Sequence, residues 1–83
     1  MREAFDEEQL RTLISTGAVR EAKACLAKGS QTKWTLEVRL GGAGSRWIPI
    51  RSAREPVRVW LSPTALVNFA RKVGLMTFVI ELW

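Results

Sequence analysis

Tryptophan and arginine side chains gather in the middle of this chain, where they could recognise nucleic acid or protein. Residues 46–51 and 57–61 alternate between apolar and polar side chains, a pattern that places every second residue on the same face of a strand. If the isoleucines and valines face the core, the aromatic and basic residues between them face the opposite side. The residues brought together in this way are Arg39, Trp47, Arg51, Arg58 and Trp60.

Three interpretations of this group remain open. Aromatic rings among arginines can stack on bases while the arginines neutralise phosphates, and the same residue types anchor protein interfaces. The tryptophans could also stack on arginine stems to shield a sheet face or to close a homodimer. We favour shielding or dimerisation over nucleic-acid binding, because no motif of a known nucleic-acid module is present. The candidate nucleic-acid or partner-binding residues are Arg39, Arg46, Trp47, Arg51, Arg54, Arg58 and Trp60.

Two segments next to this group are also basic. Residues 51–58 hold three arginines and one glutamate, which is typical of a solvated turn or of a contact to the DNA backbone. The glycine-rich residues 41–45 lie between Arg39 and Arg46, and they lack the Gly-Lys-Ser/Thr ending of a phosphate-binding loop. We therefore interpret them as a hairpin loop, with a mobile basic finger as the functional alternative.

No constellation of residues points to catalysis. The chain has no histidine, and Cys25 is its only cysteine, which leaves no His/Cys metal cluster and no nucleophile with a base. Glu37, Glu55 and Glu81 occur singly, without a second carboxylate in a pair suited to acid–base chemistry. We expect no enzymatic activity, no cofactor and no metal.

Length and charge limit the class of protein. A chain of 83 residues and 9.4 kDa has room for a single domain, residues 1–83. Residues 1–8 hold one basic and four acidic side chains, and residues 9–83 hold twelve basic and four acidic ones, which are charges of −3 and +8. A basic body attracts polyanions. The single cysteine, the acidic N-terminus and the lack of a long apolar run predict a cytoplasmic protein without membrane contact.

Two segments carry the signals of helices. Asp6 with Gln9 fits a capping box, and Gly17 fits the position just after the helix. Ser62 and Pro63 are typical first residues of a second helix, which Gly74 ends.

Strands are predicted between and after these helices. Residues 34–40 alternate most clearly, residues 46–51 suit an edge or bulged strand that contains Pro49, and residues 57–61 alternate again. Residues 19–28 fit a strand or a helix, and we favour the strand. Residues 77–83 are apolar on both faces, as in a strand inside a sheet.

These elements predict an α+β fold. The order is one helix, four strands, one helix and one strand, forming a mostly antiparallel sheet of four to five strands with both helices on one face. A chain of this size buries about 60% of its surface, so its stability is marginal and a homodimer would add to it.

Six segments in this order resemble a known family. They are residues 13–19, 34–38, 51–52, 57–60, 66–74 and 78–80, and together they resemble the small partition-associated proteins of bacterial plasmids and integrating conjugative elements. The chain has Thr32-Lys33 where that family has two glycines, and Trp60 where it has phenylalanine. The resemblance implies a bacterial accessory protein of mobile DNA that acts by binding, and it brings no catalytic residues.

Two functions follow as hypotheses. The first is a small basic binding module of plasmid or mobile-element maintenance that contacts DNA through its arginines, with Trp47 and Trp60 for stacking. The alternative is a protein-interaction or homodimerisation module with no role in nucleic-acid binding.

Overall fold

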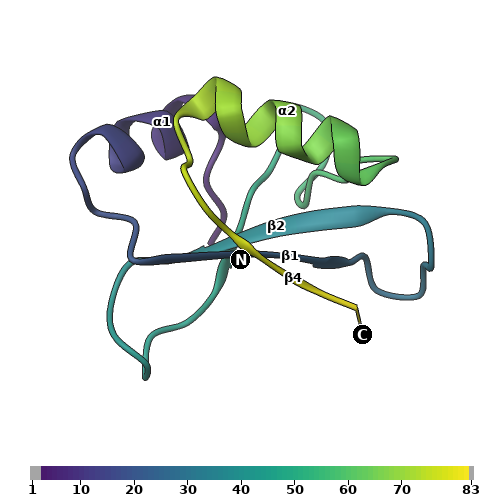
Figure 1. The fold of residues 1–83 in the computed structure, drawn as a ribbon, viewed down its shortest axis with the longest axis horizontal. Helices are drawn as coiled ribbons and strands as arrows, with labels where there is room; N and C mark the ends of the chain where they lie inside the picture. The colour runs from purple at the N-terminus through teal and green to yellow at the C-terminus, as the bar shows by residue number, and fades with distance from the viewer. Residues whose placement is uncertain (1–2, 83) are drawn as a thin grey trace.

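A four-stranded sheet carries two helices on one face in the computed structural model, which describes residues 3–82 (Figure 1). The strands lie in the order β3-β2-β1-β4. This confirms the α+β class and the placement of both helices on the same side. In chain order the elements are α1 (Glu7–Ser15), β1 (Glu21–Leu26), β2 (Trp34–Arg39), β3 (Ile48–Pro49), α2 (Pro63–Val73) and β4 (Val79–Glu81).

Local signals set the ends of both helices as predicted. The Asp6 carboxylate accepts a hydrogen bond from the Gln9 backbone at 2.8 Å, and the Gln9 side chain accepts one from the Asp6 backbone at 3.0 Å. The Ser62 hydroxyl caps α2 by accepting from the Ala65 N–H at 3.1 Å. Gly74 ends α2 with φ at 91°, a left-handed conformation that glycine adopts at little cost.

The sheet is mixed because its last strand arrives through a helix. β1 and β2 form an antiparallel hairpin, and β3 pairs antiparallel with the second half of β2. α2 then carries the chain back over the sheet, so that β4 enters parallel to β1. The strand interpretation of residues 19–28 is confirmed by β1.

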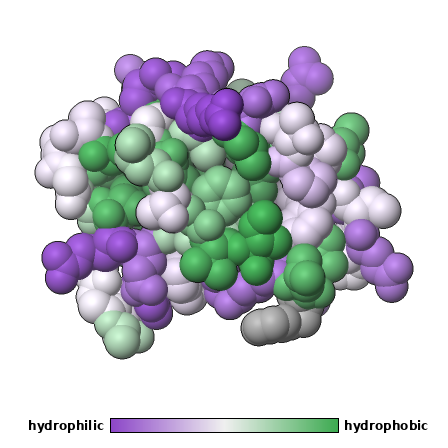
Figure 2. All heavy atoms as spheres, viewed as in Figure 1, coloured by the Kyte–Doolittle hydropathy of each residue, from purple (hydrophilic) through white to green (hydrophobic). Residues whose placement is uncertain are grey.

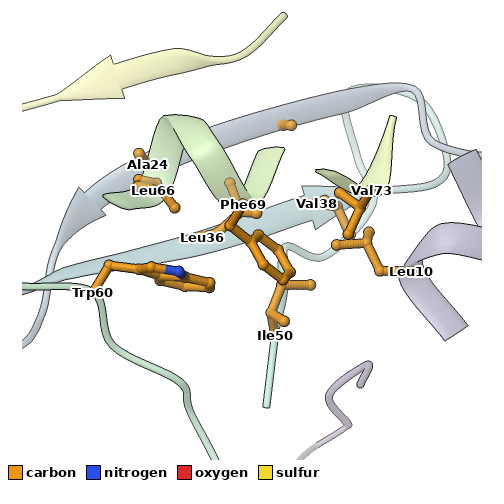
Figure 3. Close-up of a cluster of buried hydrophobic side chains, with 10 residues drawn as sticks. Leu10, Ala24, Leu36, Val38, Ile50, Trp60, Leu66, Phe69 and Val73 are labelled. Carbon is orange, nitrogen blue, oxygen red and sulfur yellow. The ribbon is translucent and has the colours of Figure 1, made fainter. Parts of the chain in front are cut away.

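The core lies between the sheet and the helices (Figure 3). β1 and β2 contribute Ala24, Leu36 and Val38, all fully buried, and the helices contribute buried side chains from above. The helix residues are Leu10 from α1 and Leu66, Phe69 and Val73 from α2. Two apolar stripes at helical spacing therefore cover one apolar sheet face.

Residues 57–61 are not a full strand, contrary to the prediction. Only Trp60 joins the sheet, through an isolated bridge to Trp34 at the start of β2. The two backbones exchange hydrogen bonds of 2.8 Å there, while Ile48 and Pro49 of β3 hold the other half of the same edge. The order is therefore helix, three strands, helix, strand, since β2 has one outer edge and β3 already occupies part of it.

The last strand lies at the edge of the sheet, not inside it. β4 pairs with β1 on one side only, and Val79 and Ile80 are exposed. β2 pairs with β1 on one side and with β3 on the other, so the outer edge of β1 is the place left for β4. Its other edge has no strand beside it within residues 3–82.

Candidate functional site

The helix-free face of the sheet presents one of the predicted tryptophans. Register places Lys23 of β1 and Arg39 of β2 on this face, and Trp47 precedes β3 beside them. The Lys23 Nζ and the Arg39 Cζ each lie 4.4 Å from the centre of the Trp47 ring. Both contacts have the geometry of cation–π interactions. Trp47 thus covers two cationic side chains of its own chain.

The charges of this face are satisfied within the chain. The Arg39 guanidinium pairs with Glu21, its cross-strand neighbour, and donates to the Ala43 carbonyl at 3.2 Å. Lys23 lies 3.2 Å from the Glu81 carboxylate and 3.8 Å from that of Glu37. Two cations thus meet three carboxylates. This arrangement gives the face no surplus of positive charge with which to attract a polyanion.

Trp60 lies on the opposite side from the one predicted for it. Its side chain is only 5% exposed and packs in the core against Phe69, with ring centres 4.9 Å apart (Figure 3). The chain after β3 runs from the sheet toward α2, and this path directs the Trp60 ring toward the helices. Trp60 is therefore a core residue, and Trp47 alone of the pair lies on the helix-free face.

The remaining candidate arginines are spread over other parts of the surface. Arg46 pairs with Glu3 at 2.7 Å, and Arg51 pairs with Asp6 at 3.4 Å. Arg58 lies over the Trp60 and Phe69 rings, on the helix side. Arg54 is exposed and forms no ion pair with any residue from 3 to 82. The structure thus separates the residues that alternation grouped together.

A second charged group surrounds Glu7 at the start of α1. Its carboxylate lies 3.1 Å from Arg11, 3.2 Å from Lys72 and 3.7 Å from Arg58. The hydrogen bond from Lys72, supported by Arg11, lowers the pKa of Glu7 below its ordinary value of 4.5. Three cations for one carboxylate leave this group positively charged. Sequence reasoning missed it because α1 and α2 are far apart in the chain.

The largest apolar exposure belongs to β4 and the residues next to it. Exposed fractions are 64% for Val79, 46% for Ile80, 71% for Leu82 and 92% for Met76. Figure 2 shows a band of hydrophobic side chains across this side of the molecule, with hydrophilic residues above and below it. Figure 1 is drawn from the same side and shows β4 in front of the other strands. We call Val79, Ile80 and Leu82, with Met76, the β4 edge patch.

A groove continues this patch toward the start of β1. It encloses about 530 Å³ between residues 19–23 and residues 74–79, with Ile14 and Trp47 at its walls. The groove opens because β4 pairs with β1 only from Lys23 onward, while residues 75–78 rise toward the end of α2. The sheet edge is therefore incomplete at this point.

The apolar run at residues 77–83 contained the signal for this surface. We interpreted side chains apolar on both faces as those of an interior strand, but an edge strand that a second chain covers has the same composition. Nothing in the local pattern tells the two apart. The described part of that run, residues 77–82, lies at the edge, and Trp83 falls outside the described residues.

A scan against protein-family models, a search of curated proteins and a search of solved structures find no match to this chain. Within residues 3–82 no helix has both the length and the apolar character needed to cross a bilayer. The same residues contain no group of three or more Cys, Asp or Glu side chains placed to hold a metal ion.

Proposed function

We propose that this chain is a binding module without catalytic activity and that it contacts another polypeptide through the β4 edge patch. The observation that carries the proposal is an edge strand whose outer side has no strand beside it in residues 3–82 and whose apolar side chains are exposed. An added strand would satisfy the free backbone groups and cover the apolar side chains together.

The way in which proteins protect free edges supports this proposal. Edge strands usually carry charged side chains, proline or a bulge that prevents pairing with other chains. β4 has a single charged residue, Glu81, and its carboxylate is directed to Lys23 of the neighbouring strand. β4 is short, with three residues, but it has no proline and no charge directed outward, whereas Pro49 protects β3 at the other end of the sheet.

The resemblance to partition-associated proteins fits into this proposal as a biological setting. On that view the chain serves plasmid or mobile-element maintenance in a bacterial cytoplasm and exerts its role through contacts between proteins. The helix-free face then shields the sheet, with Trp47 over Lys23 and Arg39.

Site-specific photo-cross-linking tests the proposed contact. A photoreactive phenylalanine analogue in place of Leu82 lies in the patch, and the same analogue in place of Asn68 lies on the exposed side of α2. We expect a covalent adduct to a polypeptide from the Leu82 position and none from the Asn68 position, with the chain expressed in bacterial cells. Equal labelling from both positions, or none from either, would contradict the proposal.

Contact with DNA is a second candidate function. It is favoured by the Glu7 group, which consists of Glu7 and the three cations around it, Arg11, Arg58 and Lys72. Arg11, Lys72 and Arg58 keep 49%, 61% and 33% of their side chains exposed around one carboxylate. Exposed cations that exceed their carboxylates suit phosphate contacts, which confer affinity without sequence choice. Arg51 and the exposed Arg54 precede Arg58 on the same chain segment.

A salt titration tests this second candidate. With about four phosphate contacts, affinity for double-stranded DNA falls about 100-fold between ~50 and ~200 mM salt. Lys72→Gln is expected to weaken binding and to make it less sensitive to salt, whereas Lys28→Gln, in the exposed turn between β1 and β2, serves as the charge-matched control. Absence of binding at the lower salt concentration, or equal losses in both variants, would exclude the Glu7 group as a DNA contact.

A further inference from the structure

We propose that the polypeptide covering the β4 edge patch is a second copy of this chain, paired antiparallel through β4 about a twofold axis at Ile80. This inference rests on the proposed function and commits it to one partner. The two four-stranded sheets would join into one continuous sheet of eight strands.

Antiparallel self-pairing places apolar side chains opposite one another on the helix side. Ile80 pairs with β1 residue Ala24, which belongs to the core, so the Ile80 side chain is on the helix side of the sheet. A twofold axis at Ile80 puts this residue opposite itself. With the pairing extended by one residue at each end of β4, Phe78 lies opposite Leu82 of the second copy. Exposed Met76, two residues before Phe78, adds apolar surface beside that pair.

The charges on the helix-free side are also compatible with this pairing. Val79 and Glu81 lie there, next to Lys23 and Cys25 of β1. The same axis places Glu81 opposite Val79 of the second copy, so no two like charges become direct cross-strand neighbours. Each Glu81 keeps the Lys23 of its own copy at 3.2 Å. The two Glu81 residues are diagonal neighbours across the axis, and each remains paired with the Lys23 of its own copy.

The other natural edge of the sheet does not offer this match. β3 has only two residues, one of them Pro49, which lacks a backbone N–H. Trp60 and Phe5 already bridge to residues beside it, at Trp34 and Ile50. A joint through β4 uses the one edge of the described sheet that has both free backbone groups and exposed apolar side chains.

The mass of the full-length protein in solution tests the inference. Light scattering coupled to size exclusion should give twice the chain mass of 9.4 kDa for the natural sequence, with dissociation on dilution. Ile80→Lys places two positive charges opposite each other at the axis and should return the mass to that of one chain. Leu61→Lys, at a residue that is 75% exposed just before α2, is the matched control and should remain dimeric.

A disulfide trap keeps the test decisive if Ile80→Lys fails to fold. In a background with Cys25→Ser, which removes the only cysteine, Ile80→Cys should form an intermolecular disulfide with oxidised glutathione as the electron acceptor. Opposed antiparallel residues have Cα atoms roughly 4.5–5.5 Å apart, within the range that a disulfide spans. Val79→Cys, whose expected neighbour is Glu81 of the second copy, should form the disulfide much more slowly.

The outcomes separate this inference from the function on which it rests. A mass of one chain at all concentrations, or equal trapping at positions 79 and 80, would overturn self-pairing at Ile80. If the Leu82 position still cross-links to a different polypeptide, the proposed function stands with another partner. If it cross-links to nothing, both fail.

Discussion

The helix-free face and the β4 edge are the two parts of the sheet that the helices leave uncovered, and they differ in what they leave unsatisfied. On the face, Trp47 lies over Lys23 and Arg39, and these two cations pair with carboxylates of neighbouring strands. At the edge, Val79, Ile80 and Leu82 remain 46–71% exposed with no strand beyond them in residues 3–82.

This difference shows which surface has free energy left to gain from a partner. Charges that already pair within the chain lose water when a partner covers them, and their existing ion pairs leave less electrostatic free energy to gain from that partner. Exposed apolar side chains gain about 25 cal/mol for each Å² removed from water. In this chain the apolar edge strand therefore has more free energy to gain from being covered than the face that holds Trp47 and Arg39.

The largest expected change in unfolding free energy comes from comparing a tryptophan on the helix-covered side of the sheet with one on the uncovered side. Trp60→Ala removes a buried ring from the core and should lower the free energy of unfolding by about 3–5 kcal/mol. Trp47→Ala removes a half-buried ring with two cation–π contacts and should cost about 1–2 kcal/mol. Urea denaturation of both variants measures the difference. Equal losses would contradict the assignment of Trp60 to the core and Trp47 to the surface.

A smaller effect tests whether the helix-free face satisfies its own charges. The Lys23 side chain is 18% exposed and pairs with Glu37 and Glu81. Lys23→Met keeps most of its apolar stem but leaves two partly buried carboxylates near each other, so we expect a loss of about 1–3 kcal/mol in unfolding free energy.

Two further variants control this measurement. Lys28→Met, in the exposed turn after β1, should change stability by less than about 0.5 kcal/mol. Adding Glu37→Gln to Lys23→Met should restore part of the loss, because it removes one of the carboxylates left without its cation. A double variant no more stable than the single one would contradict the view that the loss comes from carboxylates left without their cation.

Sequence reasoning succeeded where a few neighbouring residues decide the structure. The capping box of Asp6 and Gln9, the Ser62-Pro63 start of α2 and the final Gly74 each depend on contacts within one helical turn. β1 and β2 followed from alternation, because one face of each meets the core.

The position of each element in the sheet could not be predicted in the same way. Alternation groups side chains correctly only when the whole segment belongs to the sheet, and residues 57–61 leave it everywhere except at Trp60. The path of that segment depends on β3 occupying the edge of β2, a contact between distant residues. The same limitation applies to β4, because its position at the edge follows from the pairing of all other strands. It also applies to the ion pair of Glu7 with Lys72, because tertiary packing brings these two residues together.

The smallest expected effect concerns Glu7 and extends the comparison to a paired charge outside the sheet. The folded-state pKa of Glu7 lies below its ordinary value of 4.5, mainly because Lys72 donates a hydrogen bond to the carboxylate. A lowered pKa favours the folded state above the unfolded-state value, and this contribution disappears as pH falls through the folded-state value. Glu7→Gln should therefore lower the free energy of unfolding at about pH 7 by less than about 1 kcal/mol, with a smaller difference at about pH 3.

Glu8→Gln is the matched control for this prediction. Glu8 is the next residue of the same first helical turn, is exposed and forms no ion pair within residues 3–82, so both variants lose the same favourable interaction with the helix N-terminus. Urea denaturation at the two pH values isolates the contribution of Lys72, Arg11 and Arg58. If the two variants show the same pH dependence, the cations around Glu7 contribute nothing to folding and their charge is available to an anionic partner.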